Sequence, residues 1–143
     1  MVKTPDTPAG PAQAADTPAG PRGEMAIRTL AMPRDTNPSG DIFGGWVMSQ
    51  MDVAGGVTAG ARAKGRVATV AVQGMVFHRP VHVGDVVCCY ADIQEVGRTS
   101  ITILVEAWVL RDRHAADRLK VTEGVFTYVA LDADGTKRRV PPP

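Results

Sequence analysis

The sequence has little excess charge, no long apolar run and almost no cysteine, and each shortage excludes a class of protein. Its 16 basic residues face 15 acidic ones, so the formal net charge is only +1. Such a chain exerts little attraction on a polyanion, and we expect no nucleic-acid partner. No apolar stretch reaches the ~18 residues of a transmembrane helix, and the start, MVKTPDTPAG, lacks the pattern of a secretory signal or transit peptide. We expect no membrane partner and a cytoplasmic location.

The two cysteines, Cys88 and Cys89, are adjacent within a strand-like segment. Neighbouring side chains of a strand point to opposite faces, so these two cannot form an ordinary disulfide, and a reducing compartment fits. The histidines His78, His82 and His114 show no HExxH or cysteine-paired spacing. We therefore expect no metal site, and no P-loop or dinucleotide-binding glycine motif is present either.

Length and composition indicate one domain preceded by a tail. The 143 residues match the size of a single domain. Residues 1–24 contain the hexapeptide DTPAGP twice, within a stretch made largely of Pro, Ala, Gly and Thr. Such a stretch cannot bury enough apolar surface to offset its ordering entropy, so we expect a disordered tail or, alternatively, an arm that docks on a partner. The folded domain is expected at 25–140.

The domain pattern predicts one helix among five strands, an α+β fold. Residues 44–64 contain no proline, and their apolar residues cover nearly the whole helical circumference, which is typical of a helix buried on most sides. The residue types of strands occur at 25–32, 66–77, 85–96, 99–110 and 119–132. The later strands are joined too closely for crossover helices, so the order β-α-β-β-β-β implies a five-stranded antiparallel sheet.

One helix cannot cover both faces of that sheet. The segment 99–110 carries Ile103 and Val105 on one face but Leu104 and Trp108 on the other. Another layer must cover the second face or the edges, and the simplest candidate is a second copy of the chain.

Asp52 is the residue of the helix that requires an explanation. Aspartate is a poor helix-interior residue, and its charge is costly to bury without hydrogen bonds. Gly55 and Gly56 share its stripe of the helix, and positions without side chains beside a carboxylate indicate that another backbone or a ligand comes close. At the helix start, the free N–H groups of Gly44 and Gly45 could hold an oxyanion.

An alternative interpretation of the same residues is equally open. Asp52 is then a polar residue at a dimer contact, and the Gly55–Gly56 pair only packs closely against the sheet. The segment NPSGD before the helix is only a capped turn in this interpretation.

Five segments carry a resemblance to a known family. They are IRTLAMP at 27–33, DTNPSGDIFGGWVMSQMD at 35–52, GRVATVAVQGMVFHRPVHVGDVVCCYA at 65–91, VGRTSITILVEAWV at 96–109 and TEGVFTYVALDADG at 122–135. Together they resemble the hotdog-fold acyl-CoA thioesterases, and within them the YciA-like group. That family has the pattern N-x-x-G-x-x-x-G-G-(x)6-D, which is filled here by Asn37, Gly40, Gly44, Gly45 and Asp52.

The resemblance implies a hotdog fold, in which the five-stranded sheet wraps around one long central helix. It implies an acyl-CoA thioesterase of short- to medium-chain, broad range, with Asp52 as general base or nucleophile and an oxyanion hole at Gly44 and Gly45. Asn37 is expected to act from a partner chain, because the family's active sites lie at a dimer interface. The resemblance also implies a hexamer, built as a trimer of dimers. Coenzyme A belongs to substrate and product, so no separate cofactor is expected.

Basic and small polar residues are expected along the path of coenzyme A. The candidates are Gly40, Arg79, Arg98, Thr99 and Ser100, with Lys137, Arg138 and Arg139 as secondary candidates. Each of the basic residues can equally be a solvated surface charge. Two other functions stay open: a non-catalytic module that senses acyl-CoA, although the chain has no room for an effector domain, and an enoyl-CoA hydratase, although no histidine lies near Asp52.

Overall fold

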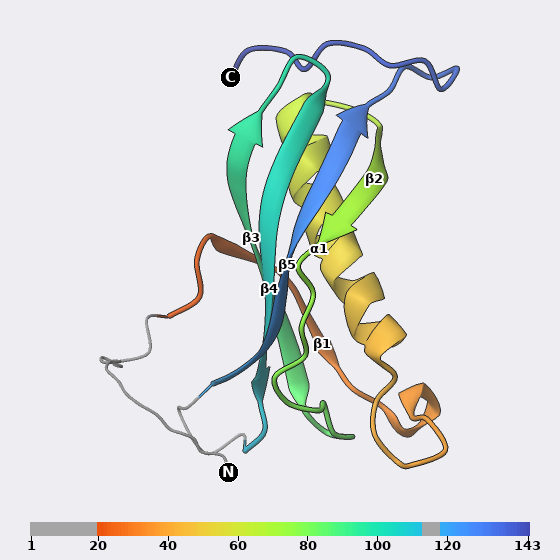
Figure 1. Cartoon of the computed structure of the whole chain (residues 1–143), viewed down its shortest axis with the longest axis vertical. Coiled ribbons are helices and arrows are strands. Elements are labelled where there is room, and N and C mark those ends of the chain that lie inside the picture. The colour runs from red at the N-terminus through yellow and green to blue at the C-terminus, as the bar shows by residue number, and fades with distance from the viewer. Residues whose placement is uncertain (1–19, 113–117) are drawn as a thin grey trace.

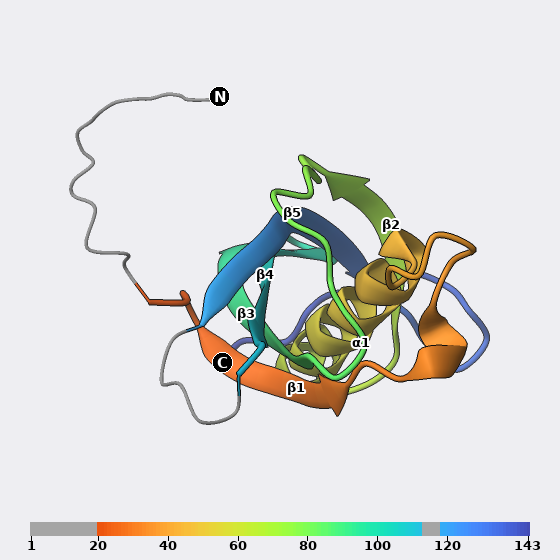
Figure 2. The ribbon, with the colours of Figure 1, turned by 90° about the horizontal axis from the view of Figure 1, so that it is seen from below.

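Five antiparallel strands form one curved sheet around a single helix. The computed structural model describes residues 20–112 and 118–143. Its elements are β1 (Glu24–Leu30), a 3-10 turn (Pro33–Asp35), α1 (Gly44–Ala63), β2 (Val67–Gln73), β3 (Val86–Val96), β4 (Ser100–Leu110) and β5 (Leu119–Ala130). The strand order is β1-β3-β4-β5-β2. The sheet curves so that α1 lies along its concave side, as Figures 1 and 2 show. The predicted α+β fold is confirmed.

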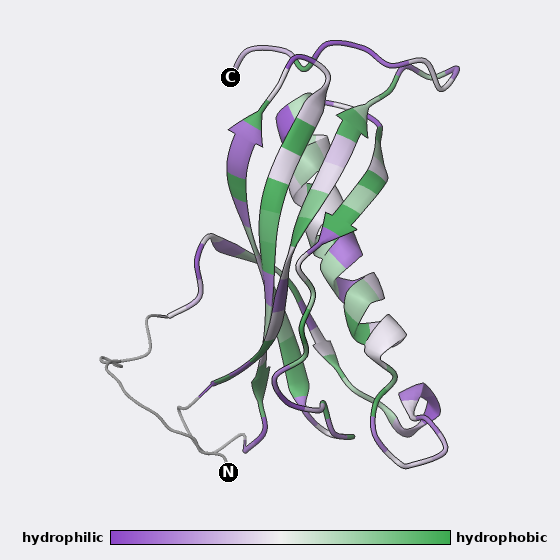
Figure 3. Ribbon diagram, viewed as in Figure 1, coloured by the Kyte–Doolittle hydropathy of each residue, from purple (hydrophilic) through white to green (hydrophobic). Residues whose placement is uncertain are grey.

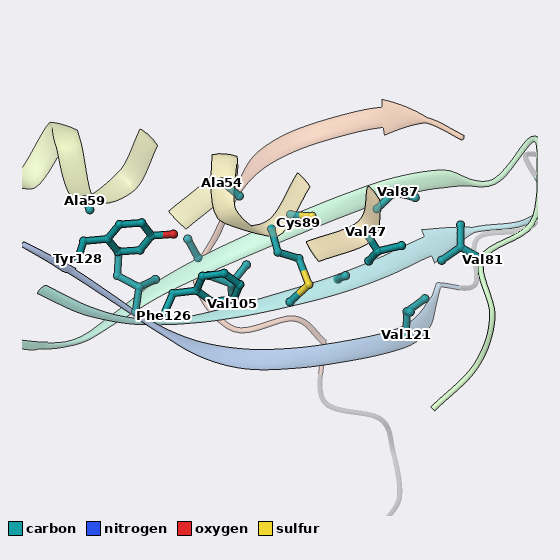
Figure 4. Packing of buried hydrophobic residues seen from close by; sticks show 14 of the residues in the cluster. Val47, Ala54, Ala59, Val81, Val87, Cys89, Val105, Val121, Phe126 and Tyr128 are labelled. Atoms are coloured by element: carbon teal, nitrogen blue, oxygen red, sulfur yellow. The ribbon is translucent and has the colours of Figure 1, made fainter. Parts of the chain in front are cut away.

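The core lies between α1 and the concave face of the sheet. Alternate residues of β4 are fully buried there, among them Ile101, Ile103 and Val105. Facing them are Val47 and Met51 of α1, which are also buried. Figure 4 shows part of this packing, and Figure 3 shows the alternation of apolar and polar residues along the strands. From Ile103 to Val109, β4 is buried on both faces, which fits the apolar residues that the sequence carries on both. By contrast, α1 is buried only along the face that meets the sheet and not on most sides as predicted, because one chain leaves its other side uncovered.

Most boundaries lie within two residues of the sequence-based expectation, and the end of β2 is the exception. Strand β2 ends at Gln73 rather than at 77, because Gly74 has a φ of 77°, which takes the chain out of the extended conformation. The following loop runs beside β5, where the N–H of His78 donates to the carbonyl of Val121 at 2.8 Å. At the other end, β1 already includes Glu24, so the folded domain begins slightly earlier than 25. Arg22, also predicted to lie in the tail, donates to the carboxylate of Glu106 at 2.6 Å, so residues 20–23 belong with the folded domain. Residues 1–19 of the predicted tail lie outside the described residues.

The convex face of the sheet is partly covered by the chain itself. A small cluster of Cys88, Tyr90 and Trp108 is buried there, and the guanidinium of Arg118 lies over the Tyr90 ring at 5.9 Å. Larger exposed apolar side chains instead lie on α1, on the edge strand β2 and in the neighbouring loops. They include Met48, Val53, Val57, Val70, Val72 and Phe77. The uncovered apolar surface is thus at the sheet edge rather than over the face.

No helix within residues 20–112 and 118–143 has the length and hydrophobicity that crossing a bilayer requires.

The C-terminal end of α1 is bound to the last part of the chain. Nη2 of Arg138 donates to the carbonyl oxygen of Ala63 at 2.8 Å, and its Nε donates to that of Leu131 at 3.0 Å. A cation at this position satisfies a carbonyl that has no partner within the helix. Arg138, a secondary candidate for coenzyme A, therefore has a structural role within one chain.

We expect Arg138→Ala to lower the free energy of unfolding by about 1–3 kcal/mol, because hydrogen bonds from a charged donor are lost at two half-buried carbonyls. Urea unfolding at a fixed protein concentration measures this. Arg139→Ala is the matched control, since the Arg139 side chain is exposed and makes no bond of this kind among the described residues. Equal stabilities of the two variants would contradict the capping role.

Candidate active site

A cavity of about 300 Å³ opens beside the middle of α1. It is lined by Gly45, Met48, Ser49 and Asp52 of α1, Thr69 and Val72 of β2, and Phe126 of β5. Asp52 is the one ionisable group in this wall, and most of the other side chains are apolar. The structure therefore places a single carboxylate at the edge of a space that could accept an apolar group.

Asp52 is held by two hydroxyl groups. Its Oδ1 accepts a hydrogen bond from Oγ1 of Thr69 at 2.7 Å and another from the Tyr128 hydroxyl at 3.0 Å. Within the described residues, Oδ2 accepts none. These bonds meet the need that the sequence analysis identified for a carboxylate in a mostly buried helix. Neither Thr69 nor Tyr128 was predicted to be a site residue, because threonine and tyrosine are common in strands.

The glycine beside Asp52 makes room for a side chain of the same protein. A Cβ atom on Gly55 would lie 2.2 Å from the Tyr128 hydroxyl oxygen, and the Tyr128 ring is only 1% exposed. At Gly56 the nearest atom of that ring would be 3.9 Å away, an ordinary contact. Close approach at Gly55, which the sequence indicates, is thus confirmed, but the approaching group is a tyrosine and not a backbone or a ligand.

The start of α1 has the features expected of an anion site, and no side chain of the described residues caps it. The N-cap residue Phe43 provides no side-chain hydrogen bond to α1. The first N–H groups, at Gly44 and Gly45, have no acceptor within the described residues. Gly45 lines the Asp52 cavity, and a Cβ there would meet nothing within 4 Å. The oxyanion role of these two N–H groups stays a prediction.

Asn37 lies in a different cavity from Asp52 within one chain. That second cavity, of about 400 Å³, is lined by the 37–44 loop, Val47 and residues 77–81. The Asn37 side-chain oxygen accepts the N–H groups of Ser39 at 2.9 Å and Asp41 at 3.1 Å, which leaves its Nδ2 available. Gly40 closes the same turn with a φ of 89°, so its requirement is conformational. The chain alone does not bring the predicted catalytic pair together.

The predicted contacts for coenzyme A lie at opposite ends of the sheet. Arg79 donates from Nε to the carbonyl of Lys120 at 2.9 Å and lines the Asn37 cavity. The turn that contains Arg98, Thr99 and Ser100 is bound instead to the other end of β5, where Ala130 donates to the Thr99 carbonyl at 2.9 Å. Lys120 and Ala130 are about 33 Å apart along an extended strand. One chain therefore does not gather these residues at one place.

Other reactive groups are not assembled in the described part of the chain. No group of three or more His, Cys, Asp or Glu residues there could hold a metal ion. Cys88 and Cys89 are free and buried. Burial raises the pKa of the Cys89 thiol to about 12, so this thiol stays protonated and is a poor nucleophile.

Comparison with known proteins gives the family. Residues 39–116 match the thioesterase superfamily. The chain belongs to this superfamily. It is 56% identical over 123 residues to the acyl-CoA thioester hydrolase YciA of Salmonella typhimurium, with 85% of this chain and 92% of the relative covered.

Solved structures of thioesterases are similar as well. A hexameric broad-specificity acyl-coenzyme A thioesterase has a TM-score of 0.80 and 52% identity, with 87% of this chain and 85% of that one covered. A hexameric hotdog-fold thioesterase of Campylobacter jejuni has a TM-score of 0.78 and 40% identity, with 83% and 91% covered. The predicted hotdog fold and the resemblance to the YciA-like group are therefore confirmed.

Tyr128 should remain protonated in the folded thioesterase. Burial, with the nearby Asp52 charge as the second cause, raises the pKa of Tyr128 well above its usual value of about 10. We expect the tyrosinate absorbance of folded wild type and Tyr128→Phe to rise equally between about pH 9 and 11, with the wild type rising more only after unfolding. The raised pKa also contributes stability that is present in full below about pH 10 and lost as the pH rises further. A larger rise in folded wild type would contradict this.

Proposed function

We propose that this chain is an acyl-CoA thioester hydrolase that converts short- to medium-chain acyl-CoA, over a broad range, to the free acid and CoA. The observation that carries the proposal is the Asp52 carboxylate, whose Oδ2 is free on the wall of an apolar cavity that also reaches Gly45 at the start of α1. An acyl group fits the apolar wall, while the carboxylate and the helix terminus face the thioester. The activities named for the relatives support this substrate class.

In the proposed reaction, Asp52 removes a proton from water as the water oxygen attacks the thioester carbonyl. The N–H groups of Gly44 or Gly45 stabilise the oxyanion that forms. When the intermediate collapses, the C–S bond breaks and the CoA thiolate takes the proton from Asp52. A nucleophilic alternative forms an anhydride at Asp52, which water then hydrolyses. We favour the water-activating route.

We infer that a second copy of the chain completes this site. The edge strand β2 carries the exposed side chains of Val70 and Val72, and Met48 of α1, which lines the Asp52 cavity together with Val72, is exposed as well. An unpaired edge bordered by apolar surface is suited to pairing with its own copy across a two-fold axis. Asn37 of the second copy would then complete the Asp52 cavity. Three such dimers would make the hexamer that is named for the similar structures.

Asp52→Ala should lower kcat for thioester hydrolysis by about 10²–10⁴-fold or more, because the base is removed while the cavity persists. A thiol-reactive dye measures CoA release from acetyl- to palmitoyl-CoA in both proteins, and light scattering checks that the oligomer is retained. Activity that survives the substitution would exclude this role for Asp52. Wild type that binds but does not cleave any acyl-CoA would indicate a sensing module, and a hydrated, unbroken thioester from crotonyl-CoA would indicate a hydratase.

Co-expression of Asp52→Ala with Asn37→Ala tests whether the site crosses subunits. In a mixed dimer, one of the two sites keeps both residues and the other keeps neither. Random co-assembly of the two weakly active variants should therefore give about a quarter of the wild-type activity. Mixing Asp52→Ala with Asp52→Asn is the control and should restore nothing. Activity no higher than the mean of the two parents would place Asn37 and Asp52 in the same chain's site.

The two buried free cysteines are compatible with a reducing compartment, and we propose that the enzyme works in the cytoplasm.

A further inference from the structure

We propose that Thr69 and Tyr128 are positioning residues that hold Oδ1 of Asp52, so that Oδ2 alone is presented to the substrate and to the proton. This inference rests on the catalytic role of Asp52 proposed above. Three features of the structure carry it: the register of two strands, the rigidity of the tyrosine and the glycine that admits it.

The strand register places both hydroxyls on the same side of the sheet. Thr69 of β2 and Tyr128 of β5 are directly opposite each other in the antiparallel pair. Opposed residues of such a pair project to the same face, and here that face is the one against α1. The register of the pair shifts just after Thr69, between Thr69 and Ala71. Irregularities of this kind re-aim side chains near functional sites.

The tyrosine has little freedom to move away. Its side chain is 1% exposed, and its ring stacks on Phe126 with 6.3 Å between the ring centroids and 12° between the planes. Figure 4 shows the Tyr128 hydroxyl directed toward the turn of α1 around Ala54. Because burial keeps this phenol protonated, it remains a hydrogen-bond donor over the working pH range.

Two hydroxyls at one oxygen restrict the rotation of the carboxylate. The Tyr128 hydroxyl also lies 3.1 Å from the backbone carbonyl oxygen of Asp52, so its one proton is shared between two acceptors of the same residue. An aspartate side chain otherwise rotates broadly about its last bond, which would spread the basic lone pairs over several directions. With Oδ1 occupied at 2.7 and 3.0 Å, the free lone pairs belong to Oδ2. The proton taken from water then goes to Oδ2, and the reacting oxygen is in place before the substrate arrives.

Gly55 is the third part of this arrangement. The Tyr128 hydroxyl occupies the space of a Cβ at that position, as the 2.2 Å approach shows. Any side chain there would push the hydroxyl away from Asp52. Alanine at Gly55 is thus expected to disturb the carboxylate although alanine is the better helix former.

The first test compares kcat and KM of variants that remove one hydroxyl and little else. Tyr128→Phe keeps the ring, and Thr69→Val keeps the shape of the side chain. We expect each to lower kcat about 10- to 100-fold with KM changed less than about threefold, since the loss is one of orientation and not of substrate binding. Thr69→Ser retains the hydroxyl and should restore most of the activity, which a merely structural role of Thr69 would not predict.

The matched glycine pair provides a second test. Gly55→Ala should lower kcat as Tyr128→Phe does, and in the Tyr128→Phe background it should cause a smaller additional loss, because both act on the same bond. Gly56→Ala, whose Cβ would be 3.9 Å from the ring, should leave kcat unchanged. Equal effects of the two alanines would overturn the role of Gly55.

Failure of this inference can be distinguished from failure of the proposed function. If wild type hydrolyses acyl-CoA and both hydroxyl-free variants keep its kcat, the positioning role is overturned and the hydrolase function stands. If wild type hydrolyses no acyl-CoA, the function fails, and crystal structures still test the arrangement. We expect the Asp52 carboxylate in one orientation in wild type and rotated in the Thr69→Val, Tyr128→Phe double variant; an unchanged carboxylate in the double variant would overturn the inference.

Discussion

A carboxylate halfway along a helix that packs one face against the sheet sets conditions for the structure around it. Burying Asp52 beside the sheet is costly unless hydrogen bonds replace those with water, and α1 has no spare donor at that depth. The donors therefore come from the strands, as the hydroxyls of Thr69 and Tyr128. The opposed register of β2 and β5 brings them together, and Gly55 leaves the space for one of them. One polar contact thus depends on three elements of the fold.

The same site lies where the sheet stops. The sheet curves around α1 and ends on this side at the edge strand β2, whose Val70 and Val72 are exposed (Figure 2). The Asp52 cavity opens at this border, whereas Asn37 lines the other cavity near the helix start. A site built at an uncovered edge is incomplete in one chain. A symmetric partner would cover the apolar edge and complete the catalytic pair in one step.

The fold could be predicted from the sequence, and so could the candidate carboxylate at Asp52, but the contacts that hold this carboxylate could not. The periodicity of α1 and the alternation in the strands depend on local burial, so their ends were placed to within a few residues except where Gly74 ends β2. Asp52 stood out because a carboxylate is unexpected in such a helix. Thr69 and Tyr128 are ordinary strand residues, and only the long-range register makes them its partners. The same holds for Arg138, whose contact with Ala63 depends on where the C-terminal segment crosses the helix end.

The choice of hydroxyl donors separates the partly buried Asp52 from the fully buried carboxylate of Glu106. Glu106, with a side chain 2% exposed, accepts from Arg22 at 2.6 Å, lies 3.7 Å from the Lys120 ammonium and accepts from Trp108. Cations and donors thus occupy both oxygens of Glu106, which is suited to a structural role. Within the described residues no cation pairs with Asp52, and only one of its oxygens is occupied. Neutral donors thus fix the direction of the Asp52 carboxylate without forming an ion pair, which is suited to the proton-accepting role proposed for it.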